Sequence, residues 1–130
     1  MTTDQNKKTI LVVEDETALR NVLVDKLSQE GFTVIGAVNG EEGLKIAAEK
    51  HPSLILLDIF MPIMDGVTML AKLRSLDAWG KHVIVLVLTN SIDAQTIAKV
   101  SGMGTTDFLI KSDWSLEALV ARIRERMADA

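Results

Sequence analysis

Short apolar runs recur along the chain and alternate with segments of helical character. Each run is rich in Val, Ile or Leu and is continuous instead of alternating with polar residues, which is typical of strands buried on both faces of a parallel sheet. The pattern therefore predicts five buried strands, over residues 10–13, 34–37, 54–57, 83–88 and 108–110.

The segments between these runs carry the spacing of amphipathic helices. A helix after the first run is predicted from Leu19, Val22, Leu23 and Leu27, which share one helix face. The next helix is predicted to start at Asn39 with Glu42 three residues on, a capping-box pattern. We expect the remaining helices over residues 67–73, ending before Trp79-Gly80, over residues 92–100, and over a last stripe capped by Ser115: Leu116, Leu119, Val120, Ile123 and Met127.

Five strand–helix units in succession predict one α/β domain, a doubly wound five-stranded parallel sheet with five helices. A chain of 130 residues with 48% hydrophobic residues fits a single core. We expect residues 1–7 to form a short polar tail and residues 8–130 to form the domain, with no output domain.

Composition removes several classes of function. The chain has no cysteine, which excludes disulfides, thiolate metal sites and a cysteine nucleophile. A net charge of -4 argues against direct nucleic-acid binding. The longest apolar stretch, residues 83–88, is far shorter than the roughly 20 residues of a membrane helix, and no secretory leader is evident. We therefore expect a cytoplasmic protein with no membrane insertion.

Polar side chains follow the predicted strands directly. Glu14 and Asp15 follow the first run, Asp58 the third, Thr89 the fourth and Lys111 the fifth. Ligands of doubly wound sheets bind at the carboxyl ends of the strands, so we expect these side chains to meet at one edge.

The chemistry of this predicted edge points to phosphoryl transfer. Clustered carboxylates repel one another unless a cation lies between them, and an all-oxygen donor set favours Mg²⁺, with Mn²⁺ possible. Lysine and threonine then neutralise and bind phosphoryl oxygens. An aspartate carboxylate can itself attack phosphorus and form an acyl phosphate. Asp58 is the candidate nucleophile because the third strand is expected beside the first.

These residues resemble the receiver domain of two-component response regulators over nearly the whole chain. Glu14-Asp15 resembles the acidic pair of the family, and residues 58–66, Asp-Ile-Phe-Met-Pro-Ile-Met-Asp-Gly, resemble its phosphoacceptor strand and loop. Thr89 resembles the hydroxyl position, Lys111 the lysine and Phe108 the aromatic switch position. The combination and order of these motifs are highly specific.

The resemblance implies a flavodoxin-like sheet of order 2-1-3-4-5 and a phosphoryl group accepted on Asp58 from a histidine kinase or histidine phosphotransfer protein. It also implies that Asp15, Asp58 and the backbone carbonyl of Phe60 bind Mg²⁺, with Glu14 acting through water. Thr89 and Lys111 would bind the phosphoryl oxygens, and Thr89 and Phe108 would switch the surface presented to a downstream protein target.

The implied protein is not an enzyme in the ordinary sense. Self-phosphorylation from phosphodonors and autodephosphorylation are expected, with no turnover of a separate substrate. It would be a monomer or a weak homodimer. A phosphate-independent pseudo-receiver, acting only as an interaction module, is the main alternative.

The sequence departs from the family pattern at several positions. Glu14 stands where aspartate is commoner, and Lys111 is followed by Ser112 where proline is usual. Asn90 follows Thr89 where a smaller residue is usual, and Phe60 is a bulky residue two positions after Asp58. Because both could restrict the access of water to an acyl phosphate, we hypothesise slow autodephosphorylation.

Two other classes of function fit the residues less well. A phosphatase of the haloacid-dehalogenase type needs a second carboxylate two residues after the nucleophile, where this chain has Phe60. A flavodoxin-like FMN carrier needs a phosphate loop after Val13, where this chain is acidic.

Several further side chains are interpreted as structural. We expect His51 and His82 on the surface away from the site, and Trp79 and Trp114 as loop anchors. The cluster of Arg122, Arg124 and Arg126 is predicted to be a solvated helix face.

Overall fold

The predicted parallel sheet is confirmed in a computed structural model, which describes residues 8–89, 94–104, 107–110 and 115–128. The strand order is β2-β1-β3-β4-β5, and all neighbouring strands run parallel. This is the doubly wound order 2-1-3-4-5. The strands are β1 (Thr9–Val13), β2 (Thr33–Ala37), β3 (Leu54–Asp58), β4 (Ile84–Thr89) and β5 (Asp107–Ile110).

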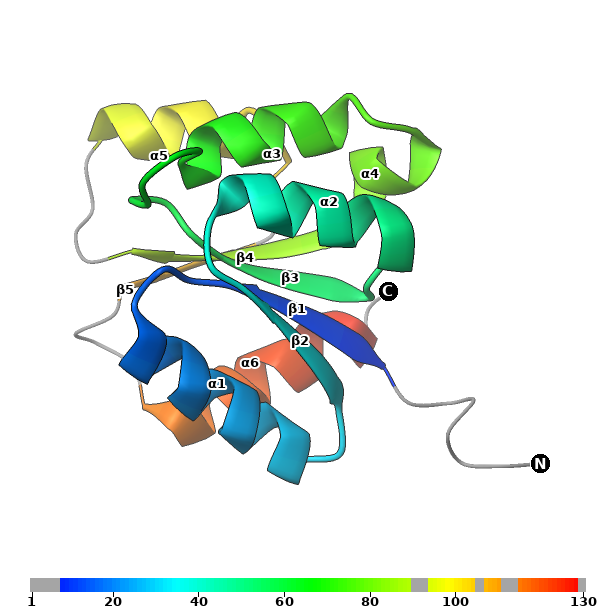
Figure 1. Ribbon diagram of the computed structural model, residues 1–130, viewed down its shortest axis with the longest axis vertical. Coiled ribbons are helices and arrows are strands. Elements are labelled where there is room, and N and C mark those ends of the chain that lie inside the picture. The colour runs from blue at the N-terminus through cyan, green and yellow to red at the C-terminus, as the bar shows by residue number, and fades with distance from the viewer. Residues whose placement is uncertain (1–7, 90–93, 105–106, 111–114, 129–130) are drawn as a thin grey trace.

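Helices cover both faces of the sheet (Figure 1). α1 and α6 lie on one face, and α2, α3 and α5 lie on the other with the short α4 beside them. The described helices are α1 (Thr17–Gln29), α2 (Gly40–Lys50), α3 (Gly66–Arg74), α4 (Ala78–His82), α5 (Ala94–Ser101) and α6 (Leu116–Ala128).

The prediction of five helices was one short, because Trp79-Gly80 lies inside α4 instead of in a loop. The Asp77 carboxylate accepts a hydrogen bond from the Gly80 N–H at 2.7 Å and starts this helix. Glycine lets α4 pack closely on the end of α3, since a Cβ on Gly80 would lie 2.2 Å from the Leu73 carbonyl oxygen.

The core consists of two layers, one on each face of the sheet. Alternate residues of β1 illustrate the division: Ile10 and Val12 pack toward α1 and α6, whereas Leu11 and Val13 pack toward α2 and α3. All five residues of β3 are buried. Burying each such side chain stabilises the fold by roughly 1.5–3 kcal/mol, so the central strands form a rigid platform for whatever follows their carboxyl ends.

Two predicted helix starts are confirmed. The Asn39 side chain accepts the Glu42 N–H at 2.8 Å, and the Glu42 carboxylate in turn accepts the Val38 N–H at 3.0 Å, one residue before the cap. The Ser115 hydroxyl oxygen accepts the Ala118 N–H at 3.1 Å and caps α6. In the part of the chain that the structure describes, no helix is both long and apolar enough to cross a membrane.

The arginines of α6 lie at the surface, with Arg124 exposed as predicted, but each is also paired with a carboxylate. Arg122 and Arg126 both contact the Asp107 carboxylate on β5. Arg124 contacts Glu30 at the end of α1, where its guanidinium holds the pKa of that carboxyl below its usual value. The sequence gives no local sign of these pairs because the partners lie on other elements.

The two histidines are exposed, as predicted, but His51 has a defined role. It ends α2 in the left-handed conformation, with φ of 45°. Its ring stacks on Trp79 with centroids 4.2 Å apart, and its Nε2 lies 3.6 Å from the Asp77 carboxylate. Trp79 therefore anchors α4 against α2, whereas Trp114 and residues 1–7 lie outside the described residues.

Candidate functional site

Buried polar side chains gather at the carboxyl edge of the sheet. Glu14 directly follows β1, and Asp58 and Thr89 end β3 and β4. Their relative exposures are 1%, 3% and 4%, and within the described ranges they are the buried polar or charged residues. Three central strands thus end in polar groups that hydrophobic packing does not require.

Three carboxylates meet at this edge. One carboxylate oxygen from each of Glu14, Asp15 and Asp58 lies within 4.8 Å of the others. Strand pairing explains the meeting, because Val13 of β1 is in register with Leu57 of β3 and the next residue on each strand is acidic. Asp15 is exposed, so the cluster opens to solvent on one side.

The electrostatics of this cluster favour a bound cation. Removing carboxylates from water costs free energy, and like charges this close repel each other. A divalent cation between the oxygens offsets both effects. Hard oxygen donors suit Mg²⁺ or Mn²⁺, and Mg²⁺ commonly binds one or two carboxylates while keeping positions for water and phosphate oxygens. The donor set therefore fits the predicted metal.

The loop between β3 and α3 is held tightly beside Asp58. The Gly66 N–H donates to the Ile59 carbonyl at 2.8 Å, and the Asp65 carboxylate caps α3 by accepting the Thr68 N–H at 2.8 Å. A hydrogen bond of 2.8 Å from the Met64 N–H to the Pro62 carbonyl closes a γ-turn at the residue between them.

That residue, Ile63, is a β-branched residue with φ of 71° and a relative exposure of 77%. Positive φ is a strained conformation for this side chain. The Gly40 N–H holds the same loop by donating to the Met64 carbonyl at 3.0 Å. Phe60, whose backbone carbonyl is a predicted metal ligand, turns its side chain outward with a relative exposure of 55%.

A second network holds the acidic loop after β1. The Glu14 N–H donates to the Ala37 carbonyl of β2 at 3.0 Å, and the Glu16 N–H donates to the Glu14 carboxylate at 3.1 Å. Arg20 of α1 donates to the Glu14 carbonyl at 2.7 Å. Sequence reasoning missed Arg20, since a side chain that binds backbone carbonyls leaves no pattern of paired residue types.

The remaining predicted site residues lie along β4 and β5. Thr89 is buried at the end of β4. This strand pairs with β3, which carries Asp58 of the acidic cluster. Phe108 of β5 is partly buried and packs on the core layer that faces α5. Lys111 and Asn90 lie outside the described residues, so their predicted contacts with a phosphoryl group stay predictions.

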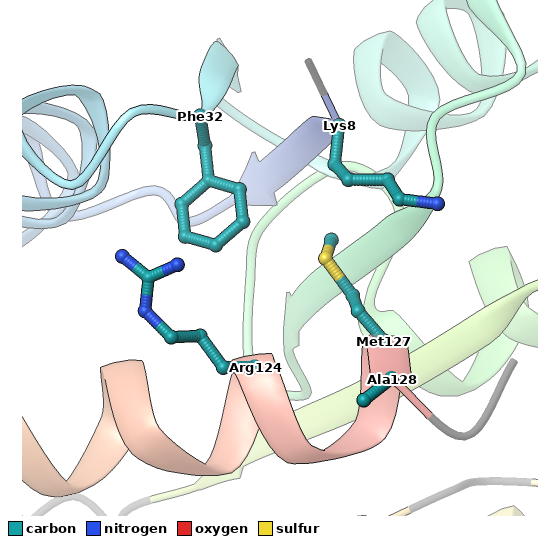
Figure 2. Close-up of a pocket in the computed structure, with 5 residues that line it drawn as sticks. All are labelled: Lys8, Phe32, Arg124, Met127 and Ala128. Carbon is teal, nitrogen blue, oxygen red and sulfur yellow. The ribbon is translucent and has the colours of Figure 1, made fainter. Parts of the chain in front are cut away.

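A hollow of about 260 Å³ lies at a different place, near the start of β1 and the end of α6. Figure 2 shows its lining, with Phe32 and Met127 beside the long side chains of Lys8 and Arg124. The Arg124 guanidinium lies over the Phe32 ring, 5.0 Å from its centroid. None of the predicted site residues lines this hollow.

The doubly wound sheet and its acidic carboxyl edge define an α/β domain with a candidate ligand site at the ends of its central strands. The family model for the response regulator receiver domain matches residues 10–124, so the chain belongs to that family. It is a receiver domain of the two-component type, and the acidic pocket of Glu14, Asp15 and Asp58 fits Mg²⁺ and an aspartyl phosphate.

Individual relatives agree with this assignment. The chain is 37% identical over 119 residues to "Probable transcriptional regulator ycf27" of Cyanophora paradoxa, covering 92% of this chain and 48% of that protein. It is 41% identical over 117 residues to the "Uncharacterized transcriptional regulatory protein YkoG" of Bacillus subtilis, covering 88% and 49%. The chain therefore spans about half the length of these curated relatives.

The fold is also that of solved receiver domains. A CheY-like response regulator receiver domain protein from Methanospirillum hungatei superimposes with a TM-score of 0.87 at 25% identity, covering 95% of both chains. The match covers nearly all of both chains, so this chain shares their overall architecture.

Proposed function

We propose that the chain accepts a phosphoryl group on Asp58 and signals by a change of its surface. The observation that carries the proposal is the burial of the Asp58 carboxylate at the end of a central strand, within 4.8 Å of two further acidic side chains. The donor would be the phosphohistidine of a histidine kinase or of a histidine phosphotransfer protein. The receiver would act without turnover of a separate substrate.

The proposed step is an in-line transfer between two side chains. A carboxylate oxygen of Asp58 attacks phosphorus, a P–O bond forms and the P–N bond of the donor breaks. The electron pair of that bond stays on the ring nitrogen. The released imidazole is neutral when its other nitrogen already carries a proton, and otherwise takes up one proton from solvent. The product is an acyl phosphate on Asp58 and a free histidine.

The side chains around Asp58 have separate roles in this proposal. Asp15, Asp58 and the Phe60 carbonyl would hold Mg²⁺, with Glu14 acting through bound water. When bound, the metal neutralises charge on the transferred phosphoryl oxygens. Thr89 would donate its hydroxyl to one of those oxygens, and Lys111 would pair with another.

The signal is proposed to pass through Thr89 and Phe108. These residues lie on neighbouring strands, with Thr89 in register with Ile110, two residues beyond Phe108. Movement of Thr89 toward a phosphoryl oxygen would open space for the Phe108 ring, which already packs on the side of α5. The surface of α5, β5 and α6 would change, and a downstream protein would recognise it.

The setting of the protein is proposed on the same basis. We expect it in the cytoplasm, as a monomer or weak homodimer, with proteins instead of nucleic acid as direct partners of this domain. The relatives are named transcriptional regulators and are about twice as long, so a nucleic-acid function of theirs is consistent with the segment that this chain does not match.

Fluoroberyllate, a mimic of the phosphoryl group, tests the site directly. ¹⁹F NMR of the protein with Mg²⁺, Be²⁺ and fluoride is expected to show bound resonances that chelation of Mg²⁺ or Asp58→Asn removes. Asp25→Asn, which neutralises an exposed aspartate of α1, is the matched control and should leave them unchanged. Absence of bound resonances in the unaltered protein would favour the phosphate-independent pseudo-receiver.

A further inference from the structure

Arg20 binds the backbone that carries the acidic pair. It lies in the first turns of α1 and is partly buried. Its Nη1 donates to the Glu14 carbonyl at 2.7 Å and, over a longer 3.4 Å, to the Asp15 carbonyl. Its Nη2 lies 3.5 Å from the Thr17 hydroxyl. The two carbonyls belong to the segment that joins β1 to α1, and Thr17 is the first residue of α1.

These two carbonyls flank one residue. The Glu14 carbonyl belongs to the peptide plane before Asp15, and the Asp15 carbonyl belongs to the plane after it. Fixing both planes fixes the φ and ψ of Asp15 and therefore the direction in which its Cβ leaves the backbone. Asp15 is the exposed member of the acidic cluster, so it has the least packing to hold it.

A second contact restrains the same loop. The residue before α1, Glu16, makes no side-chain capping bond. Its N–H instead donates to the Glu14 carboxylate at 3.1 Å, which joins the second peptide plane to a buried acidic side chain. The guanidinium thus contacts both peptide planes around Asp15, and the Glu16 N–H ties the second of these planes to the Glu14 carboxylate.

Gly36 of β2 lies against the side chain of Arg20. A Cβ built on Gly36 would lie 3.4 Å from Arg20 Cδ and 3.5 Å from Cγ, so the aliphatic part of Arg20 runs across this position of β2. β2 is an edge strand, and a side chain larger than alanine at residue 36 would bring further atoms against the Arg20 stem.

We propose that Arg20 is a positioning residue for the cation site: it orients the Asp15 carboxylate and thereby sets the affinity for Mg²⁺. The inference rests on the proposed function only in taking Mg²⁺ as the bound cation. The charge of Arg20 and its positioning of Asp15 predict opposite effects of an Arg20 substitution on the Mg²⁺ affinity. A positive charge beside the cluster weakens cation binding, so its removal alone would strengthen binding, whereas loss of positioning weakens it.

The test is the Mg²⁺ affinity of the unphosphorylated protein, measured by isothermal titration calorimetry. Arg20→Met is expected to bind Mg²⁺ about tenfold more weakly, the lower end of what loss of an outer-shell contact produces. Arg20→Lys keeps the charge but replaces the planar guanidinium, whose Nη1 reaches both carbonyls, with a shorter and flexible amine, so it should also weaken Mg²⁺ binding. Tighter binding by Arg20→Met, or unchanged binding by both variants, would overturn the proposal.

Gly36→Val supplies an independent variant. It leaves the arginine in the sequence, suits a strand, and adds methyl groups beside the Arg20 stem, which a Cβ at residue 36 would already contact. It should weaken Mg²⁺ binding like Arg20→Met. Arg124→Met is the matched control, because Arg124 also donates to a backbone carbonyl, that of Glu30, but on another part of the molecule. Its Mg²⁺ affinity should equal that of the unaltered protein.

A measurement without metal separates this proposal from the metal site itself. Amide hydrogen exchange at Glu16 should be faster in Arg20→Met and in Gly36→Val than in the Arg124→Met control, while amides of β3 stay equally protected. If the unaltered protein takes up no Mg²⁺, the cation site fails, and the exchange data still decide whether Arg20 holds the loop. Equal exchange at Glu16 in all variants would contradict the positioning role.

Discussion

The backbone of Gly66 touches the backbone of Asp58. A Cβ on Gly66 would lie 2.4 Å from the Asp58 carbonyl oxygen and 2.8 Å from the Ile59 Cα, both far inside contact distance. The start of α3 therefore packs directly on the residue proposed to accept the phosphoryl group. Since these atoms belong to the backbone, they cannot move aside as the end of a flexible side chain would.

We predict that Gly66→Ala displaces Asp58 and lowers stability. Overpacking of this kind costs about 1–3 kcal/mol in the free energy of unfolding, measured by urea denaturation. Phosphorylation by acetyl phosphate should slow in the same variant, because the carboxylate leaves its place beside Glu14. Gly102→Ala is the control, as its nearest neighbour would be an ordinary 3.5 Å away. Equal stability of the two variants would contradict the packing argument.

Mg²⁺ should stabilise the folded protein through Asp15. A ligand that binds only the folded state adds about 2.7 kcal/mol at a concentration one hundred times its dissociation constant. Thermal unfolding with and without Mg²⁺ measures this gain. Asp15→Asn should lose most of the gain and change metal-free stability little, because its side chain is exposed. If Mg²⁺ stabilises Asp15→Asn as much as the unaltered protein, Asp15 is not a ligand of the metal.

The pairing of Asp107 with two arginines predicts a dependence of stability on pH. Burial alone would raise the pKa of Asp107, but hydrogen bonds from Arg122, Arg126 and the Phe108 N–H outweigh that effect and hold the pKa below its ordinary value. A depressed folded-state pKa stabilises the fold above the unfolded pKa, near 3.9, and this contribution disappears as pH falls toward the folded value.

Asp107→Asn should therefore be less stable than the unaltered protein at pH 7, and the difference should shrink as pH falls below about 4. Urea denaturation at a series of pH values gives both curves. Asp25→Asn removes an exposed carboxylate of α1 and serves as the control, with a curve close to that of the unaltered protein. If the free energy of unfolding of Asp107→Asn stays a constant amount below that of the unaltered protein at every pH, the pairs of Asp107 with Arg122 and Arg126 do not contribute to the pH dependence.

Slow loss of phosphate is predicted from Phe60. Its side chain is 55% exposed and stands two residues after Asp58, on the loop that borders the acidic cluster. An aromatic ring there restricts the approach of water to an acyl phosphate, so Phe60→Asn should shorten its half-life several-fold. The decay of phosphorylated protein, followed by intact mass, measures this. An unchanged half-life in a variant carrying Phe60→Asn and Asn90→Ala would contradict the hypothesis.

Buried strands and the acidic edge could be predicted because their signals are local. Strands covered on both faces are continuous apolar runs, and Glu14 and Asp58 directly follow two of them. α4 was missed because it has only five residues, with a glycine at its centre that lowers helix propensity. Its formation depends on the Asp77 cap and on packing against α3, which a pattern of apolar residues does not encode.

Long-range polar contacts could not be predicted for a related reason. Arg74 donates to four backbone carbonyls, those of Met103, Gly80, Val83 and Gly104, and so ties α3 to the turn before β5. Burial in this setting lowers the pKa of Arg74. Because its acceptors are main-chain atoms, any residue type could occupy those positions, and the sequence carries no sign of the contact.

The most direct test of the central claim is the intact mass of the protein after incubation with Mg²⁺ and acetyl phosphate. We predict one added phosphoryl group, acid-stable and base-labile, in the unaltered protein and in Asp25→Ala, and none in Asp58→Ala or when Mg²⁺ is chelated. The same adduct in Asp58→Ala would place the phosphoryl group elsewhere. No adduct in the unaltered protein would contradict the phosphoacceptor role.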